Sequence, residues 1–219
     1  MQPTRVSLRL LVCTIPLVTL ARTAIAQHTS SQDTNSTIKR SMVIPLHNGH
    51  NKIDLLANGD AGEVIVSRRE NFNAHGHSIA LFQVLARNRV SPTTKPVWQL
   101  VPFFGGPGDP ASGRDLTGTS EGADCTLQDI RLVRRARGSP VEIVIGEREL
   151  GKSFADSAPV RFEFYGLMTN ADGVPGWPAY YFKHTRTARA AGTYCDVDDA
   201  FDKELNLGPA GILKWAGPP

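Results

Sequence analysis

The stretch PVEIVIGERELGKSFADSAPVRFEFYGL, residues 140–167, decides the fold class. Apolar side chains occupy every second position from Val141 to Ile145 and again from Val160 to Phe164. This period of two is typical of antiparallel strands that bury one side. We therefore predict a hairpin of two core strands, with a polar turn in which serine and aspartate side chains bond backbone amides.

Further strands are predicted outside this hairpin, because short apolar or alternating runs separated by turn residues recur along the chain. The segment from Phe103 to Asp124 is rich in Gly, Pro and Ser and is predicted to be a long loop. A short helix is predicted late in the chain, where Val197, Phe201 and Leu205 recur every four residues before Gly208-Pro209. The other predicted strands cover residues 62–69, 78–85, 97–101, 127–135 and 178–185. The expected fold is all-β, an antiparallel β-sandwich with a short C-terminal helix.

The N-terminal residues predict export. Residues 1–26 have early arginines, a short apolar stretch and a small-x-small site at Ala24 to Ala26, which is the layout of a secretory signal peptide. The apolar stretch is too short for a comfortable membrane span, so we expect no membrane anchor. Residues 27–40 are polar and predict a disordered leader, and residues 41–219 predict a single β-sandwich domain.

The charge balance of the exported chain is close to neutral. The first 26 residues hold three of the 24 basic side chains and no acid, which leaves 21 basic and 21 acidic side chains. Nucleic acid is therefore not an expected partner. The arginines between Arg131 and Arg137 are interpreted as a solvated strand face.

Two cysteines, Cys125 and Cys195, remain after removal of the signal peptide. An isolated pair in an oxidising compartment usually forms a disulfide, which here would fix the start of the predicted helix to the sheet. Closing a loop of roughly 70 residues would contribute about 4 kcal/mol on the chain-entropy account.

The turn DLLANGDAGEV, residues 54–64, places Asp54, Asn58, Asp60 and Glu63 close together. Such oxygen-rich turns hold calcium, so these four residues are candidate ligands. Leu56 stands where an ordinary calcium loop has a ligand, and Asn-Gly is also a strong hairpin-turn dipeptide. A plain turn is the alternative.

The sequence gives little support for a catalytic site, because remote Ser, His and Asp residues can be combined into a triad in almost any chain of this length. The short matches to G-x-S-x-G at Gly118 to Gly122 and to S-x-x-K at Ser36 to Lys39 lie in the predicted long loop and in the predicted leader, not in the elements that those motifs require. His75 and His77 have the spacing of two ligands on one strand, but Ile79 occupies the place of the aspartate of a zinc hydrolase. We predict that the protein is not an enzyme. A hydrolase with an unrecognised site that includes these histidines is the least favoured alternative.

Several stretches in order resemble the CarG-type carbapenem intrinsic-resistance proteins of the periplasm of Gram-negative bacteria. They are IPLHNGHNKIDLLANGDAGEVIVSRRENFNAHG, GADCTLQDIRLV, ERELGKSFADSAPVRFEFY, GVPGWPAYYF and YCDVDDAFDKELNLG, and they span the chain from about Ser41 to Gly208. The resemblance implies a periplasmic β-sandwich with short terminal helices, a homodimer, and protection from a carbapenem without hydrolysis of the drug. The ligand would be a β-lactam or a component or enzyme of the cell wall.

The same resemblance implies a fold akin to the periplasmic inhibitor of invertebrate-type lysozyme. In those inhibitors a Ser-Gly loop with a nearby tyrosine enters the lysozyme cleft. Ser112-Gly113 lies in the predicted long loop, but Arg114, Asp115 and Leu116 follow it and no tyrosine does. The alternative function is a lysozyme inhibitor or immunity protein that blocks a peptidoglycan hydrolase, with Ser112 and Gly113 as its partner-binding residues.

Overall fold

The computed structural model describes residues 41–69, 75–86, 95–122, 124–208 and 211–212. The predicted signal peptide and leader lie outside the described residues. All described residues belong to one compact unit.

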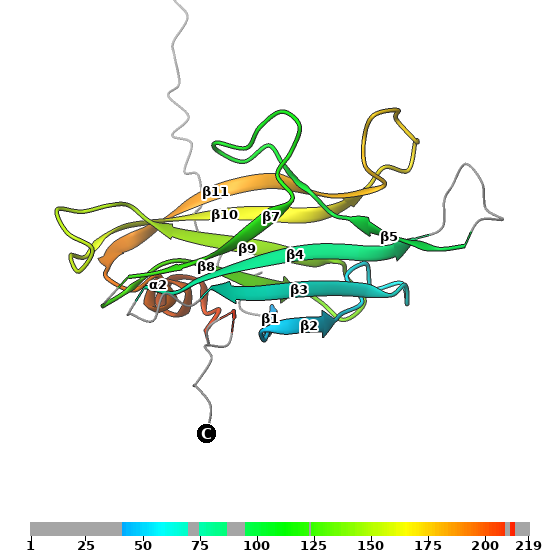
Figure 1. Ribbon diagram of the computed structural model, residues 1–219. Coiled ribbons are helices and arrows are strands. Elements are labelled where there is room, and N and C mark those ends of the chain that lie inside the picture. The colour runs from blue at the N-terminus through cyan, green and yellow to red at the C-terminus, as the bar shows by residue number, and fades with distance from the viewer. Residues whose placement is uncertain (1–40, 70–74, 87–94, 123, 209–210, 213–219) are drawn as a thin grey trace, which may run out of the picture. The chain divides into compact units, whose positions relative to one another are not determined.

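The described chain is built mainly from strands (Figure 1). In chain order the elements are β1 (Met42–Ile44), β2 (Gly49–Lys52), β3 (Gly62–Arg69), β4 (His77–Ala86), β5 (Val97–Leu100), β6 (Phe103–Phe104), β7 (Leu116–Glu121), β8 (Thr126–Arg134), β9 (Val141–Arg148), β10 (Ala158–Thr169), β11 (Tyr180–Tyr194) and α2 (Val197–Leu205).

The strands form one sheet in the order β2-β3-β4-β7-β8-β9-β10-β11-β6, with β5 beside β4 and β1 beside β8. Neighbours are antiparallel except β6 and β11, which pair in parallel. The predicted hairpin of residues 140–167 is present as β9 and β10. The predicted all-β fold with a short C-terminal helix is thereby confirmed, with one parallel pair added.

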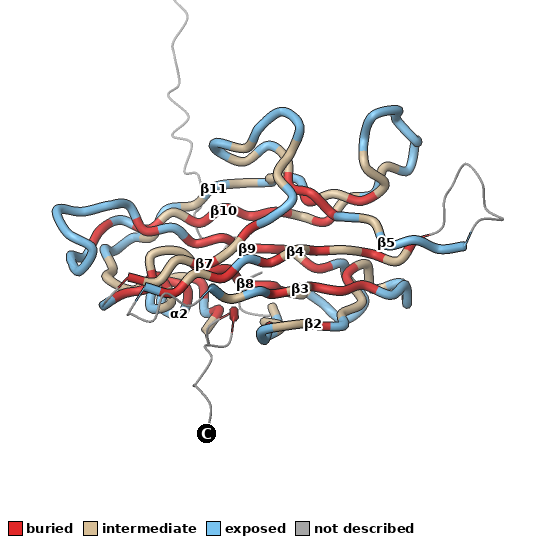
Figure 2. The backbone as a smooth tube through the Cα atoms, viewed as in Figure 1, coloured by how far each residue is buried: buried red, intermediate tan, exposed pale blue. Residues whose placement is uncertain are grey.

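The main core lies between the two halves of this sheet, which gives the sandwich-like arrangement. Phe82 of β4 contacts Phe103 of β6 and Phe182 of β11, with ring centroids 5.7 and 5.3 Å away. Phe103 also exchanges two backbone hydrogen bonds with Arg114, just before β7. Figure 2 shows that buried residues follow the strands, whereas the loops are mostly exposed.

A second core lies on the opposite face of β8 to β10, beneath α2. Val160, Phe162 and Phe164 all belong to it, as the alternation of residues 159–167 requires. Phe162 meets Phe201 of the helix at 5.2 Å between centroids. Both faces of β10 are therefore buried, one by strands and the other by the helix.

Helix α2 begins and ends on polar caps. The Asp196 side chain accepts a hydrogen bond from the Asp198 amide at 2.8 Å, and Asn206 closes the helix with a left-handed φ of 54°. Asparagine is one of the few non-glycine residues suited to that conformation. The helix therefore stops before the Gly208-Pro209 pair that was predicted to end it.

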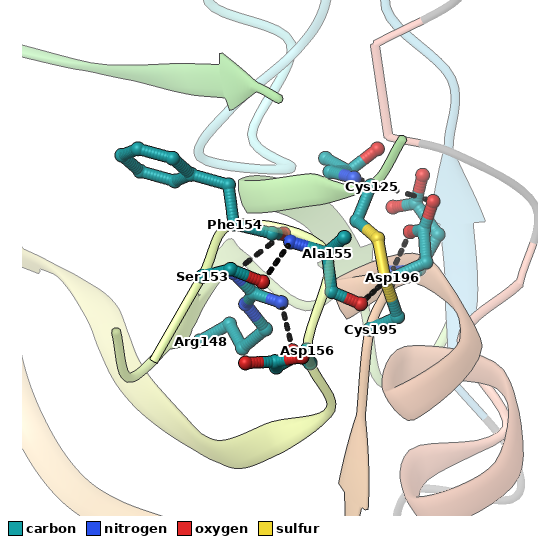
Figure 3. Close-up of a disulfide and its surroundings, with 10 residues drawn as sticks. Cys125, Arg148, Ser153, Phe154, Ala155, Asp156, Cys195 and Asp196 are labelled. Atoms are coloured by element: carbon teal, nitrogen blue, oxygen red, sulfur yellow. Dashed lines mark hydrogen bonds between the residues drawn. A yellow bond between two sulfur atoms is a disulfide. The ribbon is translucent and has the colours of Figure 1, made fainter. Parts of the chain in front are cut away.

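The predicted disulfide is present and joins the start of β8 to the start of α2 (Figure 3). The Cα atoms of Cys125 and Cys195 lie 5.6 Å apart, within the usual range for a disulfide. The bond sits beside the β9–β10 loop. There the buried Arg148 side chain donates to the carbonyls of Phe154 and Asp156.

The structure corrects two further predictions. The segment 103–124 contains β6 and β7 rather than one long loop, because Thr117 and Thr119 are buried and the Thr119 hydroxyl accepts the Ser78 amide of β4 at 3.2 Å. Arg131 is not solvated but fully buried beneath α2, where its guanidinium lies 4.2 Å from the Phe201 ring centroid.

Candidate functional site

An aromatic groove of about 440 Å³ lies where β6 and β11 meet the loops that precede β7 and β11. Three rings line it in mutual contact. The Phe104 centroid is 4.9 Å from Trp177 and 5.9 Å from Tyr181, and Trp177 and Tyr181 are 5.4 Å apart. Trp177 is 47% exposed, so the cluster offers ring surface to a ligand. We call this the aromatic groove.

The position of Trp177 is fixed by the loop between β10 and β11. Asn170 at its start accepts the Val174 amide at 2.9 Å and donates to the carbonyls of Val174 and Trp177. An asparagine side chain that bonds backbone groups in this way replaces the missing sheet pairing of a turn. The loop that carries the exposed Trp177 is therefore held in place by hydrogen bonds from Asn170.

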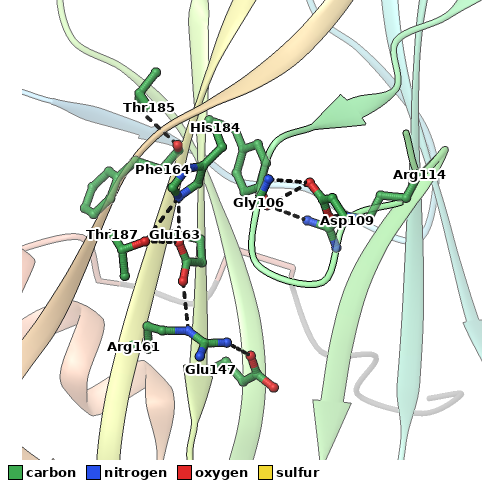
Figure 4. A network of polar contacts seen from close by, with 11 residues as sticks. Gly106, Asp109, Arg114, Glu147, Arg161, Glu163, Phe164, His184, Thr185 and Thr187 are labelled. Atoms are coloured by element: carbon green, nitrogen blue, oxygen red, sulfur yellow. Dashed lines mark hydrogen bonds and ion pairs between the residues drawn. The ribbon is translucent and has the colours of Figure 1, made fainter. Parts of the chain in front are cut away.

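The second wall of the groove is the loop 105–115, which is held from below (Figure 4). The buried Asp109 side chain pairs with Arg114 Nε at 2.8 Å and accepts the Gly106 amide at 2.8 Å. Arg114 also donates to the hydroxyl of Tyr165 from β10 at 3.1 Å, and its guanidinium lies 5.1 Å from the Phe103 ring centroid. These contacts join the loop to the aromatic core.

Tyr165 acts here as a neutral hydrogen-bonding group. Burial raises its pKa to about 12, and Arg114 opposes this shift. The phenol donates to Asp109 at 3.3 Å while it accepts from Arg114. Only glycine fits at Gly106, since a Cβ atom there would collide with the Tyr165 hydroxyl. A tyrosine thus lies beneath the Ser112-Gly113 loop, although none follows it in sequence.

A buried carboxylate, Glu163, orients the histidine that lines the groove. His184 Nε2 lies 2.6 Å from Glu163 Oε2, and a carboxylate only accepts, so this nitrogen carries the proton. The Thr187 hydroxyl donates to the same oxygen at 2.5 Å, and Arg161 Nε pairs with the other at 2.8 Å (Figure 4). These partners engage both side-chain oxygens of Glu163, which supports a structural role for it.

Three of the four predicted cation ligands, Asp54, Asp60 and Glu63, line one hollow. Asp54 accepts the backbone amides of Asn58 and Gly59, and the Asn58 amide donates to Asp60 at 2.8 Å. Glu63 lies in β3 and pairs with His50 at 2.7 Å; this hydrogen bond is the main cause of its lowered pKa. Among the described residues, no group of three or more His, Cys, Asp and Glu side chains is placed to hold a metal ion.

The predicted partner-binding residues lie in the loop 105–115, directly before Arg114, whose backbone pairs with that of Phe103. Ser112 is exposed, whereas Gly113 adopts a φ of 82° and packs so closely on Phe104 that a Cβ atom would meet the ring at 2.7 Å. Gly113 therefore shapes the loop, and Ser112 is the member of the pair that a partner would meet.

Sequence reasoning did not find the aromatic groove. Phe104, Trp177 and Tyr181 come from separate segments that the parallel β6–β11 pairing brings together. The density of aromatic, Gly and Pro residues in GVPGWPAYYF was the only local signal.

One solved structure, described as the crystal structure of CarG, shares this fold. It aligns with a TM-score of 0.58 and 21% sequence identity, over 74% of this chain and 94% of that chain. At this identity the likeness shows a CarG-like fold and does not carry function. No protein-family model and no curated protein sequence matches the chain. Among the described residues, no helix has the length and apolar character that a membrane crossing requires.

Proposed function

We propose that the protein is a non-enzymatic periplasmic binding protein that protects cells in the manner of the carbapenem intrinsic-resistance proteins it resembles. The main support is the CarG-like fold, which covers 94% of the CarG chain. The Cys125–Cys195 disulfide supports a location outside the cytoplasm, because such bonds persist in oxidising compartments.

The chemistry of the aromatic groove favours binding over catalysis. Its two nearby buried carboxylates, Asp109 and Glu163, are each held by an arginine and further donors. A general acid or base needs a pKa near the working pH and an open path to a substrate proton. Exposed rings beside the Lys183 ammonium group, by contrast, suit recognition of a small molecule.

The test is expression in carbapenem-sensitive Gram-negative cells, with measurement of both survival and drug concentration. We expect survival at higher carbapenem levels while the drug decays at the rate seen with empty vector. Accelerated decay would identify a hydrolase and would overturn the non-enzymatic proposal. No gain in survival, with the protein present in the periplasm, would overturn protection.

The exposed Ser112 on a loop anchored at its base favours a second candidate function, inhibition of a peptidoglycan hydrolase. A rigid loop tip can enter a partner's cleft at little entropic cost. The test is capture of peptidoglycan hydrolases and lysozymes by the purified protein. Ser112→Arg is the suitable variant because replacement of Gly113 would distort the loop. Equal capture by both forms would contradict this mode of binding.

A second copy of the chain is the proposed partner of the outward face of β4, β5 and β7. Ile79, Trp98, Leu100 and Leu116 are each at least 40% exposed there, an unusual gathering for a sheet face. Sedimentation of the wild type and of Leu116→Glu tests this. A dimer that the glutamate dissociates is expected, and an unchanged mass would contradict the assignment.

Calcium binding by Asp54, Asn58, Asp60 and Glu63 stays a prediction. A bound ion would have to replace the amide hydrogen bonds that now engage Asp54. Calcium that binds the folded state alone must raise Tm by mass action, so thermal unfolding with calcium and with EDTA tests the site. Equal Tm values would favour the plain turn.

A further inference from the structure

We infer that the aromatic groove binds a small molecule that carries a ring and a carboxylate, with the ring on Trp177 and the carboxylate at Lys183. This inference deepens the proposed function and rests on it, since it names the ligand class of a binding protein. It is carried by three features of the groove: its exposed rings, their fixed position, and the charge beside them.

The rings provide a preformed surface. Trp177, Phe104 and Tyr181 already contact one another, and Asn170 closes the loop that carries Trp177. A ligand ring can therefore stack without first ordering these side chains, and preorganisation of this kind favours affinity. The hollow of about 440 Å³ is within the size range of small-molecule sites.

The charge beside the rings is positive. Lys183 pairs with Phe104 in the β6–β11 register and lies two residues after Tyr181, so it emerges on the same face as both rings. It is exposed, and within the described part of the chain no acidic side chain forms an ion pair with it. Asp109, which lines the groove, and Glu163, which contacts the groove residue His184, already have arginine partners. An incoming anion is the partner left for Lys183.

Two sources share this chemistry. A carbapenem joins a fused bicyclic β-lactam to a carboxylate, and N-acetylmuramic acid of the cell wall joins a pyranose to a lactyl carboxylate. N-acetylglucosamine is the matched control because it has the same sugar ring without the lactyl group. Comparison of the two sugars therefore isolates the carboxylate.

The experiment is titration of the purified full-length protein with meropenem, N-acetylmuramic acid and N-acetylglucosamine, with ligand-observed NMR as the readout. We expect meropenem or N-acetylmuramic acid to bind at least tenfold more tightly than N-acetylglucosamine. Lys183→Met should weaken the binding of that acid roughly tenfold, the factor typical of a charge-assisted contact at a part-exposed site. Which of the two acids binds identifies the source, and either one supports the inference.

A matched pair of tryptophan variants tests the ring contact. Trp177 and Trp98 are each 47% exposed, but only Trp177 lines the groove. Trp177→Ala should abolish binding, whereas Trp98→Ala should leave it unchanged. Binding of neither acid, equal binding of both sugars, or equal loss in the two tryptophan variants would overturn the inference.

The outcomes separate this inference from the proposed function. If the protein protects cells and Lys183→Met protects them equally, while no carboxylate binds, the ligand assignment is wrong and protection stands. If the acids bind at Lys183 and Trp177 but the cells gain no survival, protection is wrong and the ligand assignment stands.

Discussion

Arg131 and Arg114 make the same kinds of contact, with an aromatic ring and with aspartate, but they hold different parts of the molecule. Arg131, with a fully buried side chain, lies 4.2 Å from the Phe201 ring centroid and pairs with Asp129 and Asp198 at 2.5 and 2.8 Å. It also donates to the Leu207 carbonyl beyond α2. It therefore ties the helix to the sheet.

Arg114 repeats the pattern nearer to solvent, with 30% of its side chain exposed. It lies over Phe103 and Tyr165 and pairs with Asp109, and so ties a loop to the core. The energetic worth of an ion pair depends on its depth, because water screens and replaces the exposed pair. The Arg131 cluster should thus stabilise the fold, whereas the Arg114 cluster should mainly position the wall of the groove.

The largest effect that tests this comparison is expected from Arg131→Met. Loss of the guanidinium leaves the buried Asp129 and the partly buried Asp198 without their shared partner, which typically costs about 3–5 kcal/mol. Urea unfolding of the variant measures the change in the free energy of unfolding. Arg114→Met is the matched control and should cost clearly less. Equal losses would mean that depth does not separate the two clusters.

Removal of the disulfide should have the next largest effect. It closes a separation of 70 residues, and its loss through Cys125→Ser with Cys195→Ser should cost about 2–4 kcal/mol. Thermal or urea unfolding measures it. The disulfide joins the start of β8 to the start of α2, and neither element lines the aromatic groove. Affinity at the groove should therefore not change. Thiol titration of the unfolded, unreduced wild type should find no free thiol from this pair.

A pH dependence of stability should also arise at the Arg131 cluster. Burial raises the pKa of Asp129 to about 8, the nearby Asp198 carboxylate acts in the same direction, and Arg131 opposes both. The unfolded value is near 3.8, so the folded state binds more protons between these pH values. The free energy of unfolding should therefore fall as pH rises from about 4 to about 8.

Asp129→Asn provides the control for that slope, because the amide keeps the shape and cannot titrate. Denaturant unfolding across this pH range should give a flatter profile for the variant than for the wild type. Parallel profiles would show that Asp129 is ionised throughout the range.

Local sequence patterns predicted the fold where each strand carries its own signal. Alternation identified β9 and β10, and the spacing of Val197, Phe201 and Leu205 identified α2. The second half of β11 was missed because it is composed of Ala, Gly, Thr and Arg, and its strand conformation depends on pairing with β10. Propensity does not report pairing between distant segments.

The same limit applies to the arginines and to the groove. The Arg131 side chain lies on the other face of β8 from Ile130 and Leu132, as alternation requires. A helix about 70 residues later covers the Arg131 face. Likewise Tyr165 reaches Arg114 from 51 residues away. The calcium prediction rested on a turn whose polar groups are neighbours in sequence, and a sequence pattern does not show that Asp54, Asn58 and Asp60 form hydrogen bonds within the turn itself.

The smallest effect on stability, and the one that separates the two arginines most clearly, is expected from Arg114→Lys. Lysine keeps the charge but lacks the planar fork that meets Asp109 and Tyr165 together. The loss should be about 1 kcal/mol, because the pair is partly solvated. The loop 105–115 should nevertheless loosen, so affinity for the carboxylate ligand should fall more than stability does.

The matched Arg131→Lys variant should show the reverse, with a large loss of stability and an unchanged groove wherever the protein remains folded. If both variants weaken binding only in proportion to unfolding, Arg114 is a structural group like Arg131 and the comparison fails.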